Sequence, residues 1–122
     1  MDDIEKVKNI ISHSRNIVFF GGAGMSTESG IPDFRSSDGI YSEDYDSYPP
    51  EYILSNTFFK ARPDTFYKFF REKSLRYMLD AEPNKGHLWL ADMEKKGKVK
   101  AVITQNIDGL HQIGRASCRE RV

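Results

Sequence analysis

Clustered glycine and hydroxyl residues at positions 21–29, Gly-Gly-Ala-Gly-Met-Ser-Thr-Glu-Ser, suit phosphate binding. They directly follow residues 17–20, a short apolar and partly β-branched run that is typical of a buried parallel strand. A strand that enters a glycine loop and then a helix presents backbone N–H groups to a phosphate, and glycine lets the ligand approach the backbone. Ser26 and Thr27 stand where that helix would begin. The pattern therefore predicts a phosphate-binding loop.

The glycine spacing alone leaves a second interpretation open, which is a tight strand-to-helix turn without a ligand. Thr27 takes the place of the third glycine of the dinucleotide fingerprint, and the absence of the P-loop lysine argues against nucleoside triphosphate hydrolysis. The continuation Gly-Ile-Pro-Asp-Phe-Arg at positions 30–35 favours a binding site. A packing turn has no need for a stiff proline, an acid, an aromatic ring and a cation together.

A second polar cluster, Thr-Gln-Asn-Ile-Asp-Gly-Leu-His-Gln at positions 104–112, follows the apolar run 101–104. In an open parallel sheet ligands bind at the carboxyl ends of strands, which is also where the glycine loop is expected. Gln105, Asn106 and Asp108 carry amide and carboxylate groups suited to ribose hydroxyls or a carboxamide. The alternative is a strand end with an Asp-Gly turn that bonds its own backbone.

The flanking elements must hold these two loops at one edge of a sheet. Apolar residues at helical spacing predict an amphipathic helix over residues 3–14. Asn84 is expected to cap a helix that ends at Gly97, and residues 101–104 then form the second strand. This order predicts an α/β fold with a parallel sheet.

Between the two motifs lies a segment that we interpret as a small helical insertion, at about residues 36–80. Residues 35–50 form a polar loop that is too long for a simple connector, and its tyrosines are expected to pack the loop down. Helices are predicted to begin near Pro50 and to run over residues 63–79, where the aromatic side chains read as core.

Composition excludes several classes of protein. The 18 basic and 18 acidic side chains balance, so no strong field attracts nucleic acid or an anionic membrane. The N-terminus lacks the pattern of a signal peptide, and no apolar run approaches membrane-spanning length. The single cysteine, Cys118, cannot form an internal disulfide or a cysteine-built zinc site. We therefore expect a cytoplasmic protein with neither nucleic acid nor membrane as a partner.

The two motifs, Gly-Ala-Gly-Met-Ser-x-x-x-Gly-Ile-Pro-Asp-Phe-Arg and Thr-Gln-Asn-Ile-Asp-Gly-Leu-His-Gln, resemble those of the sirtuins, the NAD-dependent protein lysine deacylases. Pro83-Asn84 with His87 one helical turn later is also similar to that family. The resemblance covers residues 1–112 and implies the N-terminal part of a bacterial-type catalytic domain, with a Rossmann-like sheet and a helical insertion. Gly22 and Met25 depart mildly from the common pattern and remove no needed group.

The resemblance implies an NAD site. The residues that it implies for NAD binding are Gly22, Ala23, Gly24, Thr27, Asp33, Phe34, Arg35, Gln105, Asn106, Ile107 and Asp108. Phe34 would cover the nicotinamide, Gln105 and Asn106 would position its ribose, and Asp108 with a buried Ile107 would hold its carboxamide. Asn106 and Asp108 are the candidate catalytic residues.

The family's chemistry also needs a histidine base, and this chain lacks it where the family carries it. Residues 113–122, Ile-Gly-Arg-Ala-Ser-Cys-Arg-Glu-Arg-Val, stand in its place. They back-translate in one frame into a common sequencing-library adapter, so we hypothesise a non-native tail, with a natural tail as the alternative. His111 and His87 are interpreted as structural, and His13 as a surface residue. Zinc could bind the full-length protein, but this chain offers no ligands for it.

The leading hypothesis is that the intact protein removes acetyl or other acyl groups from protein lysine, giving nicotinamide and O-acetyl-ADP-ribose. The chain as written is expected to be inactive because it lacks the base. Two alternatives stay open. One is a non-catalytic NAD- or ADP-ribose-binding module, and the other is a full-length protein that hydrolyses NAD or transfers ADP-ribose.

Overall fold

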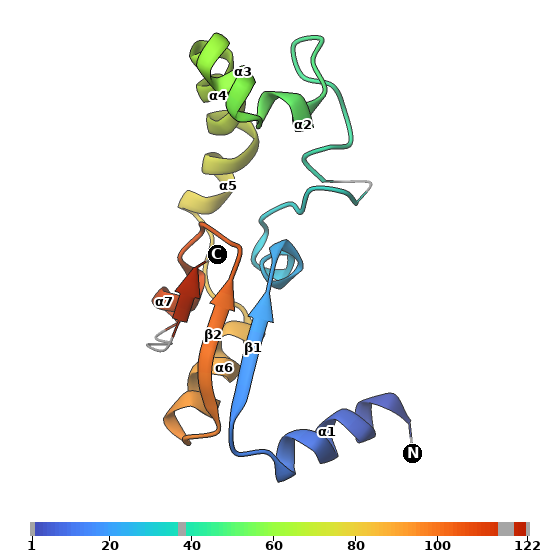
Figure 1. Ribbon diagram of the computed structural model, residues 1–122, viewed down its shortest axis with the longest axis vertical. Coiled ribbons are helices and arrows are strands. Elements are labelled where there is room, and N and C mark those ends of the chain that lie inside the picture. Colours follow the sequence, from blue (N-terminus) through green and yellow to red (C-terminus); the bar gives the residue numbers. More distant parts are fainter. Residues whose placement is uncertain (1, 37–38, 115–118, 122) are drawn as a thin grey trace. The chain divides into compact units, whose positions relative to one another are not determined.

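The computed structural model describes residues 2–36, 39–114 and 119–121 (Figure 1). Two compact units are present, and we call residues 1–22 with 83–122 the sheet unit and residues 23–82 the helical unit. The elements of the sheet unit are α1 (Asp3–His13), β1 (Ile17–Gly21), α6 (Lys85–Lys95), β2 (Val99–Thr104), α7 (Leu110–Ile113) and β3 (Arg119–Arg121). Those of the helical unit are η1 (Ala23–Met25), η2 (Thr27–Ser29), α2 (Pro50–Ile53), α3 (Asn56–Ala61), α4 (Pro63–Phe70), the π-helical turn η3 (Arg71–Leu75) and α5 (Arg76–Leu79).

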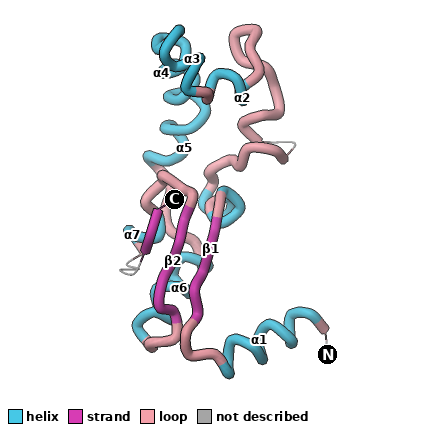
Figure 2. Tube along the Cα trace, viewed as in Figure 1, coloured by secondary structure: helices cyan, strands magenta, loops and turns pink. Residues whose placement is uncertain are grey.

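The sheet unit is built on a parallel sheet in the order β1-β2-β3, as the α/β prediction requires (Figure 2). Helix α6 connects β1 to β2 in the manner of a crossover and packs against β2. Leu90 and Ala91 of α6 and Val99 and Val102 of β2 are buried and supply the core of this unit. The β1–β2 register places Gly21 opposite Thr104, so both strands end at the same edge.

Helix α1 forms as predicted and is held at both ends. At its start the Asp2 carboxylate accepts a hydrogen bond from the Glu5 N–H at 2.8 Å. At its end the Lys98 ammonium donates to the carbonyls of Ile11 and Ser12, at 3.2 and 3.1 Å, where the helix dipole favours a cation. The apolar side of the helix stays exposed at Ile4, Val7 and Ile10.

The helical unit has its own core, in which Ile53, Phe58 and Phe69 are fully buried. The residues that pack around these three are Ile40, Tyr45, Tyr48, Leu54 and Phe66. The Tyr45 hydroxyl donates to the Glu72 carboxylate at 2.6 Å, and burial together with this carboxylate raises the pKa of Tyr45 to about 12. The long loop is thus anchored by its tyrosines, as expected.

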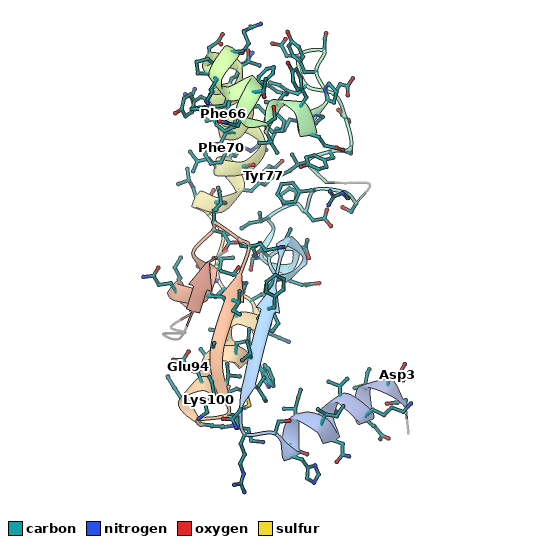
Figure 3. The ribbon with its side chains drawn as sticks, in the orientation of Figure 1. Asp3, Phe66, Phe70, Tyr77, Glu94 and Lys100 are labelled. Atoms are coloured by element: carbon teal, nitrogen blue, oxygen red, sulfur yellow. The ribbon has the colours of Figure 1, made fainter. Side chains whose placement is uncertain are left out.

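The helical stretch predicted over residues 63–79 is confirmed, although it is not a uniform α-helix. Phe66 and Phe70 stack along α4 with ring centroids 6.2 Å apart (Figure 3). The π-helical turn η3 follows and α5 completes the run. Helix α3 was not predicted, although Ser55 caps it by accepting the Phe58 N–H at 3.1 Å.

The proposed non-native tail falls partly outside the described residues, which exclude residues 115–118 and 122. Arg119–Arg121 pair with β2 as strand β3. Ladder hydrogen bonds join backbones and not side chains, so this pairing does not test the origin of the tail. None of the helices in the described part of the chain has the length and apolar character that crossing a membrane requires.

The core of the helical unit yields a first prediction. Phe58→Ala removes a fully buried ring, so the free energy of unfolding should fall by about 3–5 kcal/mol. Urea unfolding followed by far-ultraviolet circular dichroism measures the change. Tyr67→Ala is the matched control, because Tyr67 is more than half exposed and its truncation should cost much less. Equal losses in the two variants would contradict this core assignment.

Candidate functional site

The edge of the sheet where β1 and β2 end is closed by two hydrogen bonds between the motif loops. The Gln105 N–H donates to the Gly21 carbonyl at 3.1 Å, which continues the β ladder by one step. The Asn106 side-chain amide then donates to the Gly22 carbonyl at 2.8 Å. Two motifs that are distant in sequence are thereby joined, as the strand-end argument predicted.

At the two glycines of this edge, neighbouring side chains occupy the space that a Cβ would take. A Cβ at Gly21 would lie 2.5 Å from Cε1 of the Phe19 ring, which is a clash. A Cβ at Gly22 would lie 2.9 Å from the side-chain oxygen of Gln105. A side chain at Gly21 would displace the Phe19 ring, whereas one at Gly22 would meet only the end of the exposed Gln105 side chain, which can move.

The loop after β2 is shaped by its own polar side chains. The Thr104 hydroxyl accepts the Asn106 N–H at 3.0 Å, and the Asp108 carboxylate accepts the Leu110 N–H at 2.9 Å. Gly109 follows with a φ of +73°, a left-handed conformation that glycine adopts without strain. The Asp-Gly turn considered as an alternative is therefore present, and it aims the loop into α7.

Residues 104 and 106–112 line a cavity of about 190 Å³. Ile107 is 58% exposed, so the prediction of a buried Ile107 is wrong for this chain. It lies in the loop between the strand end and the turn, where no described segment covers it. Gln105 is also exposed, whereas Asn106 and Asp108 are half-buried.

In the helical unit, residues 23–29 form two short 3₁₀ turns, η1 and η2. The predicted helix start at Ser26 and Thr27 is therefore wrong in type. Gly30 adopts a φ of +89° and ends the second turn, and Pro32 cannot continue a helix. Ser26 is buried, and the Thr27 hydroxyl donates to the Gly24 carbonyl at 3.0 Å.

Asp33, Phe34 and Arg35 begin the long loop and are organised around its own residues. The Asp33 carbonyl accepts the Ile40 N–H at 2.7 Å, and its carboxylate accepts the Ser36 N–H at 3.3 Å. The rings of Phe34 and Tyr41 lie 5.3 Å apart, and the Arg35 guanidinium lies 5.7 Å from the Tyr41 ring centroid. The Tyr41 ring thus contacts two predicted site residues, Phe34 and Arg35. The sequence analysis missed this contact, and the one signal for it was that Tyr41 lies in the same loop.

The structure therefore brings Gly22, Gln105 and Asn106 together in the sheet unit, and holds Phe34 and Arg35 against Tyr41 in the helical unit. Ala23, Gly24 and Thr27 lie in the turns that begin the helical unit. Within the described residues, no group of three or more histidine, cysteine or acidic side chains is placed to hold a metal ion.

The histidines behave as the sequence indicated. His13 is exposed at the end of α1. His87 and His111 are buried, with exposed fractions of 0% and 3%. The two histidines of the sheet unit that lie near Asn106 in the sequence or the fold are therefore buried, and the exposed one lies on α1.

The model of the Sir2 family matches residues 22–119 of this chain. The chain belongs to the Sir2 family. It is 54% identical over 114 residues to the NAD-dependent protein deacetylase of Clostridium acetobutylicum, an alignment that covers 93% of this chain and 46% of that protein. The Sir2 chain therefore spans about half the length of the curated relatives that it matches.

Solved Sir2 structures have the same fold over this part. A Sir2 variant with a deacetylated p53 peptide and 3′-O-acetyl ADP-ribose superposes with a TM-score of 0.85 at 41% identity, covering 97% of this chain and 46% of that one. A Sir2 complex with a p53 peptide and NAD⁺ gives a TM-score of 0.77 at 40% identity, covering 97% and 44%. The Rossmann-like assignment is confirmed for the part of the fold that this chain forms.

The hydrogen bond between the loops can be tested by its effect on stability. Asn106→Ala removes the amide that bonds the Gly22 carbonyl, so the free energy of unfolding should fall by about 1 kcal/mol. Gln105→Ala is the control, because the exposed Gln105 is tied to β1 through its backbone N–H, which the substitution retains. If both variants unfold at the same urea concentration as the parent chain, the side-chain bond does not join the loops in solution.

Proposed function

We propose that this chain supplies the nicotinamide-ribose end of the NAD site of a protein lysine deacetylase. The observation that carries the proposal is the hydrogen bond from Asn106 to Gly22, which holds the two motif loops at one sheet edge. Support also comes from the relatives, which are named NAD-dependent protein deacetylases. The substrate that we assign is acetylated lysine in proteins, and the compartment is the cytoplasm.

Asn106 is suited to orient a ribose because its side-chain amide has both a donor group and an acceptor group. Its NH₂ group donates to the Gly22 carbonyl, which determines the orientation of the amide. Its oxygen, with two lone pairs, is the group that we assign to a ribose hydroxyl. The exposed Gln105 amide extends the same polar edge.

Asp108 is the residue that we assign to the nicotinamide carboxamide. Its carboxylate takes the Leu110 N–H at 2.9 Å, and a carboxylate offers about four acceptor positions, so it can also accept an amide NH₂. The backbone bond holds the side chain in one orientation. A carboxylate that is oriented in advance binds an amide without a further ordering cost.

When bound, NAD would supply the ribose carbon that forms a bond with the acetyl oxygen of the substrate as its bond to nicotinamide breaks. The contribution of the residues in this chain would be to orient the ribose through Asn106 and Gln105 and to hold the carboxamide through Asp108. Phe34, from the helical unit, is the ring that we assign to covering the nicotinamide. Ile107 is exposed in the chain alone, so its water-excluding role would require a covering segment or a ligand.

A second candidate, a binding module without catalysis, is favoured by the state of the histidines. His87 and His111 are buried, and His13 lies on α1, so this chain by itself presents no histidine base to a ligand at the sheet edge. Binding of ADP-ribose or NAD by the isolated chain without release of nicotinamide would support the module.

A chimera tests the deacetylase proposal directly. Residues 1–112 of this chain replace the matching part of the Clostridium acetobutylicum relative, with which they share about half of their residues. The chimera should deacetylate an acetylated peptide in an NAD-dependent reaction and form O-acetyl-ADP-ribose. Asn106→Ala or Asp108→Asn should lower kcat/KM by at least about a hundredfold, the scale for losing an oriented polar group in an active site.

The control for the chimera is Lys100→Ala, which changes an exposed residue near the start of β2, the end opposite to Thr104 (Figure 3). Its kcat/KM should stay within about threefold of the parent chimera, which is less than about 1 kcal/mol. A soluble, folded chimera that binds the peptide and does not turn over would contradict the proposed deacetylase function and leave the module as the better candidate.

A further inference from the structure

Two buried histidines face each other behind the loop that carries Asn106 and Asp108. His87, in the first turn of α6, and His111, on α7, have exposed fractions of 0% and 3%. Their ring centroids lie 4.8 Å apart in a T-shaped arrangement. The centroid of the Phe19 ring of β1 lies 6.0 Å from that of His111. None of these three side chains belongs to the NAD site proposed above.

The hydrogen bonds of His87 determine which tautomer it adopts. The Asn84 N–H donates to Nδ1 of His87 at 3.1 Å, so Nδ1 must be unprotonated and must act as an acceptor. The neutral ring therefore carries its proton on Nε2, a buried atom that has no hydrogen-bond partner among the described residues. The Asn84 carboxamide oxygen accepts the backbone N–H of His87 as well as that of Gly86, at 2.9 Å for Gly86, so the two side chains form a capping box at the start of α6.

Protonation of His87 would act against the fold in three ways. A proton on Nδ1 would replace the acceptor of the Asn84 N–H with a donor, which breaks half of the capping box. The new cation would lie at the N-terminus of α6, where the helix dipole disfavours positive charge. It would also be fully buried, where a charge is costly unless it is paired.

Two titratable groups among the described residues act on the charge of His87. His111, from α7, disfavours a cation on His87, and Asp108, from the loop after β2, favours one. Burial is the largest effect, and together with His111 it lowers the pKa of His87 below its ordinary value. The attraction of Asp108 does not reverse this direction.

The pair joins the start of α6 to the loop that follows β2. His111 comes three residues after Asp108, whose carboxylate holds the Leu110 N–H at the start of α7. A displacement of His111 away from a charged His87 would therefore move the turn that orients Asp108. The contact of the two rings is the physical link between helix capping and loop geometry.

We propose that neutral His87, packed against His111, is a positioning device, which holds the Asn106–Asp108 loop in place at neutral pH and releases it in mild acid. Its effect on NAD binding rests on the proposed function, but its effect on stability does not. The folded-state pKa of His87 is lowered, so the unfolded chain binds more protons below the ordinary histidine pKa of about 6.5. The stabilisation is present above about pH 6.5 and is lost as the pH falls towards the folded pKa.

The variant that separates titration from capping is His87→Gln. Glutamine at the third position of a helix can still accept the N-cap N–H, and it does not titrate. Urea unfolding of the full chain, followed by the fluorescence of Trp89 on α6, would be measured between about pH 7.5 and about pH 5 for both proteins. The unfolding equilibrium constant of the parent should rise more than that of His87→Gln, because only the parent carries a histidine whose pKa is lowered in the folded state.

His13→Gln is the matched control, since it removes an exposed histidine and keeps the His87–His111 contact, so the loss of stability in acid should persist in it. Histidine ring ¹⁵N NMR of the parent chain gives a second readout that does not depend on any variant folding. His87 should show the Nε2–H tautomer and stay neutral at a pH just below the ordinary histidine pKa of about 6.5. A His87 ring that becomes charged at the ordinary histidine pKa of about 6.5, or equal pH dependence of unfolding in the parent and His87→Gln, would overturn the proposal.

NAD titration at about pH 7.5 and about pH 5.5 tests the consequence for the site, with ADP-ribose as a second ligand. The parent chain should bind NAD less tightly at the lower pH, and His87→Gln should lose less affinity. Failure to bind NAD at either pH, combined with the expected unfolding data, would contradict the proposed function alone. Equal loss of affinity in both proteins would overturn the link between the histidine pair and the loop.

Discussion

The parallel pairing of β1 with β2 is the constraint on which the rest of this structure depends. It places Gly21 opposite Thr104, so that the two motif loops leave the sheet at one edge. The Gln105 N–H and the Asn106 side-chain amide then donate to the carbonyls of Gly21 and Gly22, because the register has already brought these groups within hydrogen-bond distance. A shift of one residue in this register would turn each side chain to the other face and separate these groups.

The helical unit is inserted between β1 and α6 without disturbing that pairing. Residues 23–82 leave the sheet unit after Gly22 and return at Pro83, and they carry a core of their own around Ile53, Phe58 and Phe69. The entropic cost of closing a loop grows slowly with its length, by about 0.6 kcal/mol for each doubling. A segment that folds by itself therefore adds little to the cost of bringing β1 and β2 together.

Local signals in the sequence predicted the elements whose start or end is determined by a single residue. Asn84 identifies the start of α6, Gly97 its end, and the apolar run before Gly21 the first strand. Where several weak preferences compete, prediction was poorer. The turns at residues 23–29 look like a helix start until the left-handed Gly30 ends them, and the π-helical turn η3 has no residue type that distinguishes it from a normal helix.

The candidate site divides along the same line. The approach of Asn106 to Gly22 follows from strand order alone, so it could be predicted from motif positions. The exposure of Ile107 and the contact of Tyr41 with Phe34 and Arg35 depend on which segments surround them, and no spacing rule carries that information. His87 was interpreted as a structural residue, which agrees with its place in the capping box of α6, but its contact with His111 is tertiary and needed the fold.

One face of the sheet unit is uncovered, and the bonds that form the site edge do not depend on covering it. A parallel sheet is normally covered on both faces, and α6 packs on this one through β2. Val18 and Phe20 share a face of β1 by strand alternation and are 58% and 59% exposed, so that face gains little from burial here. The bonds at Gly21 and Gly22 come from backbone register and from one amide, and neither requires that face to be covered. The half-site therefore depends on the register of β1 and β2 and on the hydrogen bonds of the loop after β2, and the buried histidine pair adds a side-chain contact between that loop and the start of α6.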